Sequence, residues 1–258
     1  MSPLDRIARN TEEIVTQEEL ETLLTEKEHP KAYIGFEPSG LVHIGWKVCL
    51  DKVRDLLESN FEVTVLLADW HAYLNDKLDG DIDNIRACGE YIKDVFSAFG
   101  VASDNLSFVY ASELLDGMDY WEKVLRISKK SSLSRIKRTL TIMGRNEDEA
   151  DLDASKLIYP AMQVADIFQL DVDVALGGMD QRKAHMLARD VSDKLGKRKV
   201  VALHTPLLSG IQGGGRMDPI EAKMSKSNPE NSIFIHDTPE EIERKVKKAF
   251  CPEGEVAD

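Results

Sequence analysis

The sequence predicts an α/β protein built on a doubly wound parallel sheet. Strand-like segments alternate with helical ones, and the strands are rich in β-branched and apolar residues, as expected for strands buried on both faces. With 258 residues, 42% of them hydrophobic, the chain can bury a substantial core. The predicted strands are 32–36, 61–68, 107–111, 171–177 and 199–204, and the predicted helices between them include 44–59, 83–99 and 180–195.

The first strand–helix–strand unit carries an unusual turn. "AYIGF" (32–36) is an apolar strand, helical spacing of apolar residues begins at Ile44, and "FEVTVLLAD" (61–69) is the next strand. A right-handed crossover places the intervening turn at the carboxyl edge of the sheet, with His43 and Gly45 on the first turn of the helix. Because free N–H groups and the positive helix end face that edge, we expect a phosphate to bind there.

Polar residues follow four of the predicted strands. Glu37 follows the first strand, Asp69 and His71 the second, Ser112 the third and "GGMDQ" (177–181) the fourth. A lone aspartate after a strand is more often a helix cap than a ligand. In open parallel sheets, however, the ligand crevice lies outside the carboxyl ends of the strands, so four polar strand ends together predict a binding site.

A second segment suited to phosphate is "KMSKS" at 223–227, which lies between two stretches of turn-forming residues. Its lysines, hydroxyls and free N–H groups suit a triphosphate whose charge increases toward a leaving pyrophosphate. A solvated basic loop would be the better interpretation if this segment stood alone. Together with the turn at His43, it predicts a nucleotide site.

Composition excludes several classes of protein. No apolar run approaches the length of a membrane span and the charged N-terminus lacks the core of a signal peptide, so we expect no membrane association and a cytoplasmic location. Cys49, Cys88 and Cys251 are far apart and predict neither a disulfide framework nor a metal site. A net charge of −13 argues against non-specific coating of nucleic acid, although "KKSSLSRIKR" (129–138) is locally basic.

The alternation of strands and helices breaks between about 113 and 165, where consecutive helices predict an insertion between the two halves of the fold. We therefore expect a main domain at 1–238 that contains this insertion. A further helix begins at Pro239, and 239–258 are expected to be the start of a truncated C-terminal helical region.

His-Ile-Gly at 43–45 and Lys-Met-Ser-Lys-Ser at 223–227 together resemble the paired signatures of class I aminoacyl-tRNA synthetases. The resemblance implies a Rossmann-like catalytic domain in which an amino-acid carboxylate attacks the α-phosphate of ATP, helped mainly by position and charge. Mg²⁺ would arrive with ATP, and no tightly bound cofactor is expected. The implied catalytic residues are His43, Gly45, Lys223 and Lys226. The implied ATP-binding residues are Gly35, Glu37, His43, Gly45, Gly178, Asp180, Lys223, Met224, Ser225, Lys226 and Ser227.

Four further segments, "YIGFEPSG" (33–40), "LLADWHAYLND" (66–76), "YPAMQVAD" (159–166) and "GGMDQRKAHMLAR" (177–189), resemble the archaeal and eukaryotic branch of tyrosyl-tRNA synthetases from about residue 5 onward. By position, Tyr33 and Asp166 would hydrogen-bond the substrate phenol. Such a pair rejects phenylalanine because its own polar groups would stay unpaired, a rule for which these synthetases are the standard example. The residues around the substrate ammonium would be Tyr159, Gln163 and Gln181.

The resemblance also implies tRNA(Tyr) as a partner, with Arg138 and Arg182 as acceptor-stem contacts, and a homodimer through the helical insertion. It further implies that 239–258 begin a helical anticodon-binding domain. With that domain truncated, charging of tRNA would be weak and little affected by the anticodon. One departure is Trp46, which stands where the signature has its second histidine. The apolar residues expected at the dimer surface are Leu114, Leu115, Tyr120, Trp121, Leu125, Ile127, Leu133 and Ile136.

Three alternatives stay open. A tryptophanyl-tRNA synthetase would share both signatures, but the pair of Tyr33 and Asp166 favours a phenol over an indole. A nucleotidyltransferase would share the His43 turn but lack the segment at 223–227. A synthetase-like protein that binds tyrosine or RNA without charging is disfavoured by the intact signatures.

Overall fold

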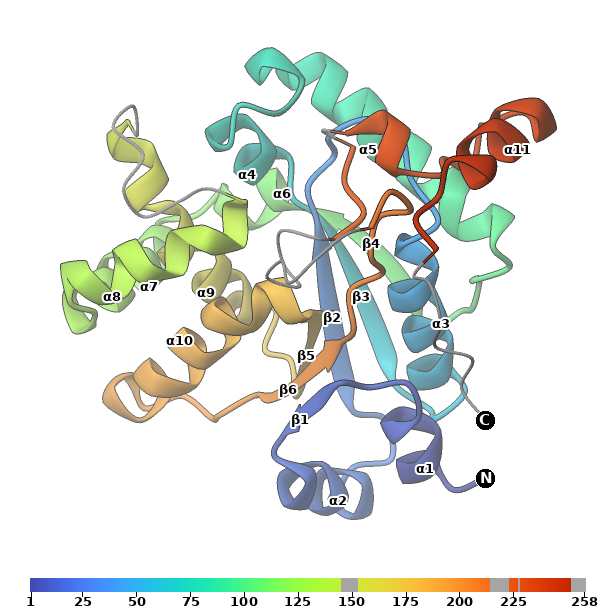
Figure 1. Ribbon diagram of the computed structural model, residues 1–258. Coiled ribbons are helices and arrows are strands. Elements are labelled where there is room, and N and C mark those ends of the chain that lie inside the picture. Colours follow the sequence, from blue (N-terminus) through green and yellow to red (C-terminus); the bar gives the residue numbers. More distant parts are fainter. Residues whose placement is uncertain (145–152, 214–222, 227, 252–258) are drawn as a thin grey trace.

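A six-stranded sheet with the order β1-β6-β5-β2-β3-β4 forms the centre of the computed structural model, which describes residues 1–144, 153–213, 223–226 and 228–251 (Figure 1). Neighbouring strands are parallel except that β1 runs antiparallel to β6. The chain moves outward from β2 to β4 and returns beside β2 as β5, so the switch point lies between β2 and β5. The strands are β1 (Glu13–Val15), β2 (Lys31–Phe36), β3 (Glu62–Leu67), β4 (Leu106–Tyr110), β5 (Val174–Gly178) and β6 (Val201–Thr205).

The predicted α/β fold and its five parallel strands are confirmed. The edge strand β1 was not predicted, because three residues are too few to show an alternating pattern. The helices are α1 (Pro3–Ala8), α2 (Gln17–Glu26), α3 (Trp46–Leu57), α4 (Asp69–Leu74), α5 (Ile82–Ala98), α6 (Ala111–Leu115), α7 (Met118–Lys130), α8 (Leu133–Thr139), α9 (Tyr159–Gln169), α10 (Arg182–Ser192) and α11 (Pro239–Lys247), with short 3₁₀ turns at Lys77–Gly80, Leu140–Met143, Ala154–Leu157, Met179–Gln181, Asp193–Leu195 and Pro229–Asn231.

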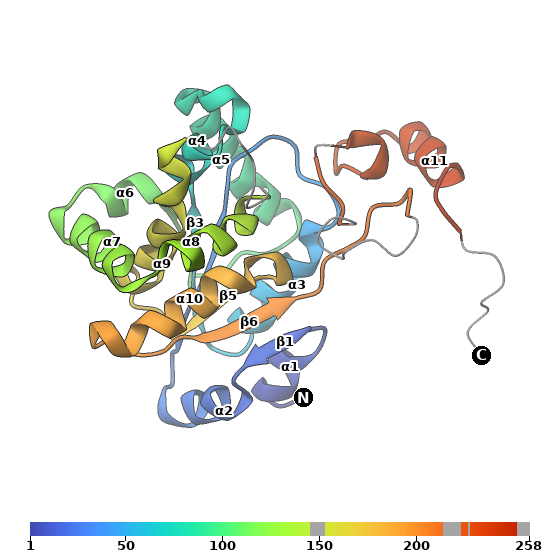
Figure 2. The same ribbon diagram turned by 60° about the vertical axis from the view of Figure 1, so that its left-hand side comes forward.

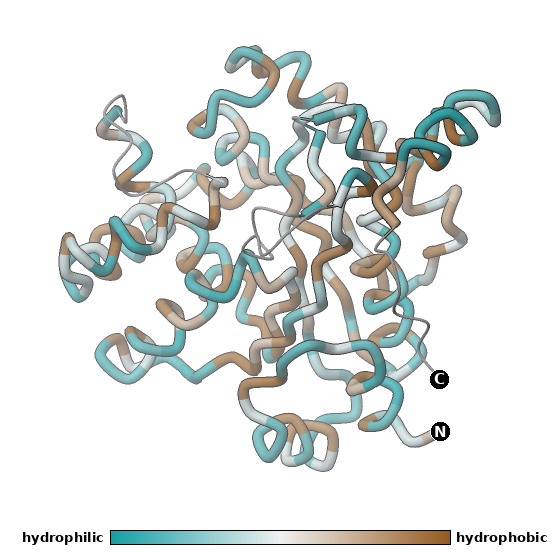
Figure 3. Tube along the Cα trace, viewed as in Figure 1, coloured by the Kyte–Doolittle hydropathy of each residue, from teal (hydrophilic) through white to brown (hydrophobic). Residues whose placement is uncertain are grey.

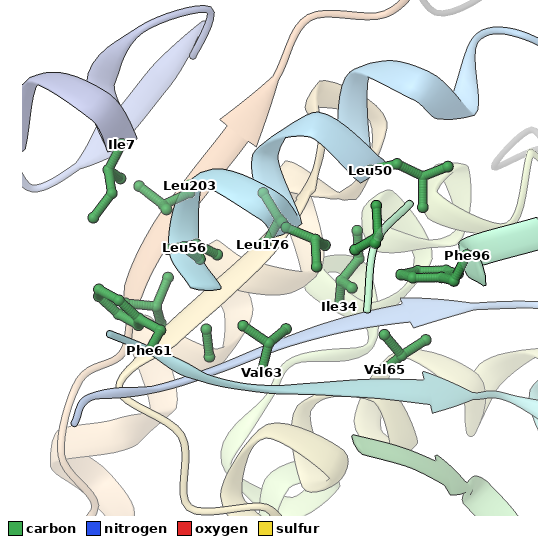
Figure 4. Packing of buried hydrophobic residues seen from close by; sticks show 14 of the residues in the cluster. Ile7, Ile34, Leu50, Leu56, Phe61, Val63, Val65, Phe96, Leu176 and Leu203 are labelled. Carbon is green, nitrogen blue, oxygen red and sulfur yellow. The ribbon is translucent and has the colours of Figure 1, made fainter. Parts of the chain in front are cut away.

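Helices cover both faces of the sheet (Figures 1 and 2). On one face, side chains of α1, α3 and α5 pack over Ile34 of β2 and its neighbours, as Figure 4 shows for Leu50, Leu56 and Phe96. On the other face lie α7, α8, α9 and α10. The strands are accordingly apolar along most of their length (Figure 3).

The alternation of side chains along β2 decides where the site forms. Ala32 and Ile34 belong to the core beneath α3 and α5, whereas Tyr33 belongs to the core beneath α9. Tyr33 therefore faces α9, although all three side chains are buried.

The start of α3 corrects one prediction. The helix begins at Trp46 with Gly45 as its N-cap, so His43 lies before the helix and not on its first turn. His43 instead pairs with Phe234, and the N–H of Ile44 donates to Ile233 O at 2.9 Å. Apolar spacing could not show this, because the pairing partner is almost two hundred residues away in the sequence.

Some of the apolar residues predicted to form a dimer surface are buried in the core of this chain. Tyr120, Ile127 and Ile136 are buried against α9 and the sheet, because α7 and α8 are amphipathic and these residues lie on the inner face. Placing these three at a dimer surface was therefore wrong. Leu125 and Leu133 stay 68% and 61% exposed.

The described residues include neither a membrane-spanning helix nor a cluster of metal-binding side chains. None of the helices there is long and apolar enough to cross a bilayer. Nor do three or more histidine, cysteine, aspartate or glutamate side chains there come together as metal ligands.

Candidate active site

The candidate site lies outside the carboxyl ends of β2, β3 and β5. Tyr159, Gln163 and Asp166 follow one another at intervals of four and three residues on α9, so they share one face of that helix. Tyr33 approaches from β2, and Gln181 lies in the 3₁₀ turn after β5. The structure thus brings together the five residues predicted to bind tyrosine.

Asp166 is the charged centre of this pocket and is buried. Its Oδ1 accepts a 2.7 Å hydrogen bond from the hydroxyl of Tyr120, and its Oδ2 lies 3.0 Å from Nε2 of His71. Burial raises the pKa of Tyr33, and the charge of Asp166 raises it further. The Tyr33 hydroxyl therefore keeps its proton at neutral pH and can donate a hydrogen bond.

Several buried polar atoms in the pocket have unmet hydrogen bonds. Among the described residues, Nδ1 of His71 has no hydrogen-bond partner and Oε1 of Gln163 accepts no hydrogen bond, whereas Nε2 of His71 has its contact with Asp166. The Gln163 amide is oriented by its Nε2, which donates to Oε1 of Gln181 at 3.1 Å. Leaving such atoms unpaired costs about 1–3 kcal/mol each, so a polar ligand that satisfied them would bind favourably.

Glu37 forms a second acidic group beside the first. Tyr159 donates to its Oε1 at 2.6 Å, and Nδ2 of Asn75 lies 3.0 and 3.1 Å from its two oxygens. Glu37 was predicted to bind ATP, and these hydrogen bonds join it to Tyr159, which was predicted to bind tyrosine. A carboxylate in this position suits a cationic group such as an ammonium.

His43 is held as a neutral imidazole. Burial lowers its pKa to about 4, with smaller contributions from the charges of Lys226 and Lys223. The N–H of Gly45 donates to Nδ1 at 3.2 Å, which leaves the proton on Nε2, free to donate outward. A Cβ on residue 45 would lie 2.8 Å from Nδ1, so only glycine allows this close approach.

The loop at 223–226 lies against the same edge. Nζ of Lys226 donates to Oγ of Ser39 at 2.8 Å and lies 5.3 Å from the ring centre of Trp46. Burial lowers the pKa of Lys226 to about 8. Trp46, which replaces the second signature histidine, stacks on Phe36 at 4.3 Å and offers a cation–π contact in place of an imidazole.

The other residues predicted to bind ATP line the same edge. Lys223 pairs with Asp180 at 2.6 Å, and Met224 is buried, with its N–H donating to Leu208 O. A Cβ on Gly178 would lie 2.7 Å from Asp180 Oδ1, whereas one on Gly35 would make only ordinary contact with Tyr33. Ser225 accepts a hydrogen bond through its carbonyl, and Ser227 lies outside the described residues.

The two predicted RNA contacts lie elsewhere on the surface. Arg182 makes a bidentate pair with Glu13 at 2.7 and 2.8 Å. Arg138 is exposed near the end of α8.

Sequence analysis missed three polar residues of the pocket. His71 was noticed at a strand end but was given no role. Tyr120 was taken as apolar surface, although its spacing on α7 places it on the buried face. Asn75 carried no recognisable pattern, because it reaches Glu37 only through the turn after α4.

Residues 25–257 match the family described as tRNA synthetases class I (W and Y). The chain belongs to this family. The tyrosine–tRNA ligase of Sulfurisphaera tokodaii is 56% identical over 98% of this chain and 71% of its own length, and that of Aeropyrum pernix is 55% identical over 98% and 72%. The predicted family is therefore confirmed.

Solved structures of tyrosyl-tRNA synthetases share the fold of this class I synthetase. The Aeropyrum pernix enzyme superposes with a TM-score of 0.88 at 53% identity, covering 97% of this chain and 72% of that one. The Archaeoglobus fulgidus enzyme, solved in complex with L-tyrosine, gives 0.87 at 44% identity, covering 98% and 76%.

The contact between His71 and Asp166 predicts a pH-dependent stability. Burial lowers the pKa of His71, but Asp166, Glu37 and Asp69 together raise it above its ordinary value. The stabilisation is therefore complete below about pH 6.5 and is lost as pH rises through the raised folded-state pKa. We expect the difference in unfolding free energy between wild type and His71→Gln to shrink from pH 6 to pH 9 in urea titrations. The control is His29→Gln, at an exposed histidine, and a difference that grew with pH would contradict the assignment.

Proposed function

We propose that this chain activates tyrosine with ATP to form tyrosyl-adenylate and then transfers the tyrosyl group to tRNA(Tyr). The observation that carries the proposal is the pocket in which Tyr33, Asp166 and His71 present buried polar atoms at the switch point of the sheet. The relatives at 53–56% identity, all named tyrosine–tRNA ligases, support it.

In this proposal Tyr33 donates to the substrate phenol oxygen and Asp166 accepts its proton. The ammonium lies among Tyr159, Gln163 and Gln181, with the charge of Glu37 nearby. A phenyl side chain offers no partner to Tyr33 or Asp166, and an indole N–H can donate to Asp166 but cannot accept from Tyr33. That asymmetry favours tyrosine over tryptophan within the family.

Activation then needs little acid–base chemistry. A carboxylate oxygen of tyrosine attacks the α-phosphorus of ATP, a new O–P bond forms, and the bond to the bridging oxygen breaks to release pyrophosphate. His43 donates from Nε2 to the phosphates, while Lys223 and Lys226 stabilise the charge that develops on the leaving group. Mg²⁺ arrives with ATP, and no tightly bound cofactor takes part. Gly45 and Met224, Ser225 and Ser227 of the loop complete the phosphate site, and Gly35, Gly178 and Asp180 hold the adenosine.

Pyrophosphate exchange into ATP tests the activation step. We expect exchange with tyrosine, and background levels with tryptophan, phenylalanine or no added amino acid. Exchange with tryptophan but not tyrosine would overturn the substrate assignment. A lack of exchange with every amino acid would overturn the proposed activity.

The acceptor end of tRNA(Tyr) is proposed to contact Arg138 and Arg182. We expect Arg138→Ala to lower the rate of tRNA charging about tenfold and to reduce its salt dependence, since one phosphate or base contact is lost. Pyrophosphate exchange should not change. Arg6→Ala, at an arginine of α1 that pairs with Glu58, is the control. Equal losses in exchange and charging would contradict an RNA-binding role.

The outer face of α7 and α8 is proposed as a homodimer interface. Leu125 and Leu133 are largely exposed there, as is Met118. We expect light scattering to show a dimer at micromolar concentration and Leu125→Glu to shift it toward monomer. The control is Val246→Glu, which places the same charge at an exposed apolar residue of α11, outside the proposed interface. It should leave the dimer intact. A monomeric wild type would contradict this interface.

We also propose that 1–238 form the catalytic domain, with the helical insertion at about 113–165, and that 239–258 begin a C-terminal helical region. A cytoplasmic location follows from the proposed activity, since charged tRNA is consumed by ribosomes there.

A further inference from the structure

Residues 232–237, here called the bracing segment, lie against both phosphate-binding parts of the site. Toward the turn at His43, the N–H of Ile44 donates to Ile233 O at 2.9 Å and the N–H of Ile235 donates to Val42 O at 3.1 Å. The two segments thus pair like short antiparallel strands, with His43 opposite Phe234.

The same segment holds the loop at 223–226. Ser232 is fully buried, and its Oγ donates to Ser225 O at 2.8 Å. The loop that carries Lys226 and the turn that carries His43 are therefore joined through one short piece of chain. Ser232 itself, like Ile233 and Ile235, is not among the proposed substrate-binding groups.

Lys245 of α11 fixes the bracing segment from behind. Its side chain is 5% exposed, and its ammonium donates to Ser232 O at 2.9 Å and to Asp237 Oδ2 at 2.6 Å. It also lies 5.0 Å from the ring centre of Phe234, whose N–H donates to the same Asp237 oxygen at 2.9 Å. Because a buried ammonium is costly unless it is paired, this arrangement ties α11 firmly to the segment.

We propose that Lys245 is a positioning residue for adenylate formation. By holding the bracing segment, it sets the distance between His43 and Lys226, which act on the same phosphates. A misplacement of about 1 Å in such a constellation lowers the rate about a hundredfold. The inference rests on the proposed function for its kinetic consequence, but the physical link between α11 and the two segments stands apart from any activity.

The first test is kinetic. We expect Lys245→Met, which keeps the length of the side chain and removes its charge, to lower the single-turnover rate of tyrosyl-adenylate formation at least tenfold. The dissociation constant for tyrosine should stay within about twofold, because the tyrosine pocket lies on the other side of β2. The matched control is Lys247→Met on the same helix, where the lysine is 72% exposed and pairs with Glu243, and it should behave as wild type.

A second variant distinguishes an effect transmitted from Lys245 through Ser232 to the loop from a general loss of packing. Ser232→Ala removes only the hydrogen bond to Ser225, and we expect a smaller loss of rate. The double variant Lys245→Met/Ser232→Ala should lose less than the product of the two single losses, because both act through one chain of contacts. Multiplicative losses, an unchanged rate in Lys245→Met or an equal loss in tyrosine binding would each overturn the proposal.

Hydrogen exchange measures the same link without activity. We expect the amides of 42–44 and 223–226 to exchange faster in Lys245→Met than in wild type or Lys247→Met, with the strands of the sheet unchanged. If wild type failed to activate tyrosine, the proposed function would be wrong, and this measurement would still decide the positioning role. Unchanged exchange at both segments would overturn it.

Discussion

Replacing Lys226 by alanine lowers the rate of tyrosyl-adenylate formation by an expected 10²- to 10³-fold, roughly the loss seen when one preorganised charge-stabilising donor is removed. The ammonium is held beside Ser39 and Trp46, at the same edge as His43. Its interaction strengthens as charge develops on the leaving pyrophosphate, so the rate should fall far more than tyrosine binding. Lys223→Ala should act in the same direction, because Lys223 is held at this edge by Asp180.

Single-turnover kinetics with a separate tyrosine titration checks this expectation. Lys199→Ala, at a surface lysine paired with Asp193, serves as the control and should keep the wild-type rate. Unchanged rates in both loop variants would refute the role of the loop.

The pKa of Lys226 adds a pH dependence to the same prediction. Since burial lowers it to about 8, the side chain loses its positive charge as pH rises through that value. We expect kcat/KM for ATP, which reports on the free enzyme, to fall above about pH 8. Lys226→Arg keeps its charge and should remove this decline, even if its absolute rate is lower. A decline that persisted in the arginine variant would assign the titration to another group.

Replacing Asp166 by asparagine should raise the dissociation constant for tyrosine about a hundredfold, equivalent to about 2.7 kcal/mol. The carboxylate is buried and is oriented by Tyr120 and His71, so it meets a phenol proton without further desolvation. An amide of the same shape can turn its NH₂ toward that proton and lacks the charge. ATP binding should change little, because the segments proposed to bind the nucleotide are 43–45 and 223–226.

Discrimination between tyrosine and phenylalanine gives a second measurement on Asp166→Asn. The ratio of tyrosine to phenylalanine activation should fall in Asp166→Asn, because the hydrogen bond that the carboxylate accepts from the phenol, and that phenylalanine cannot form, is weakened. Asp193→Asn, at a surface aspartate, is the control and should keep the ratio. Equal weakening of tyrosine and ATP binding, or an unchanged ratio, would contradict the assigned role, and a urea titration would show whether the variant remains folded.

The sequence predicted the parts of the site that depend on local pattern. The alternation of strands and helices placed Glu37, His71 and Gln181 at strand ends, and therefore at one edge of the sheet. Tyr33 and Asp166 were found through resemblance, and the structure brings them to facing sides of one pocket. The start of α3 was misplaced because a pairing partner at Phe234 replaces the expected helical turn.

By itself, the sequence determined the fold class and indicated the two segments proposed to bind phosphate, because periodicity and turn residues act over a few neighbouring positions. Only the tertiary structure decided that Tyr120 donates to Asp166, that Tyr159 donates to Glu37 and that Lys245 donates to Ser232 of the bracing segment. Nothing in the local sequence pattern around any of these side chains indicates its partner. Its partner lies on another element, and the identity of that partner is fixed only when folding buries the two polar groups side by side.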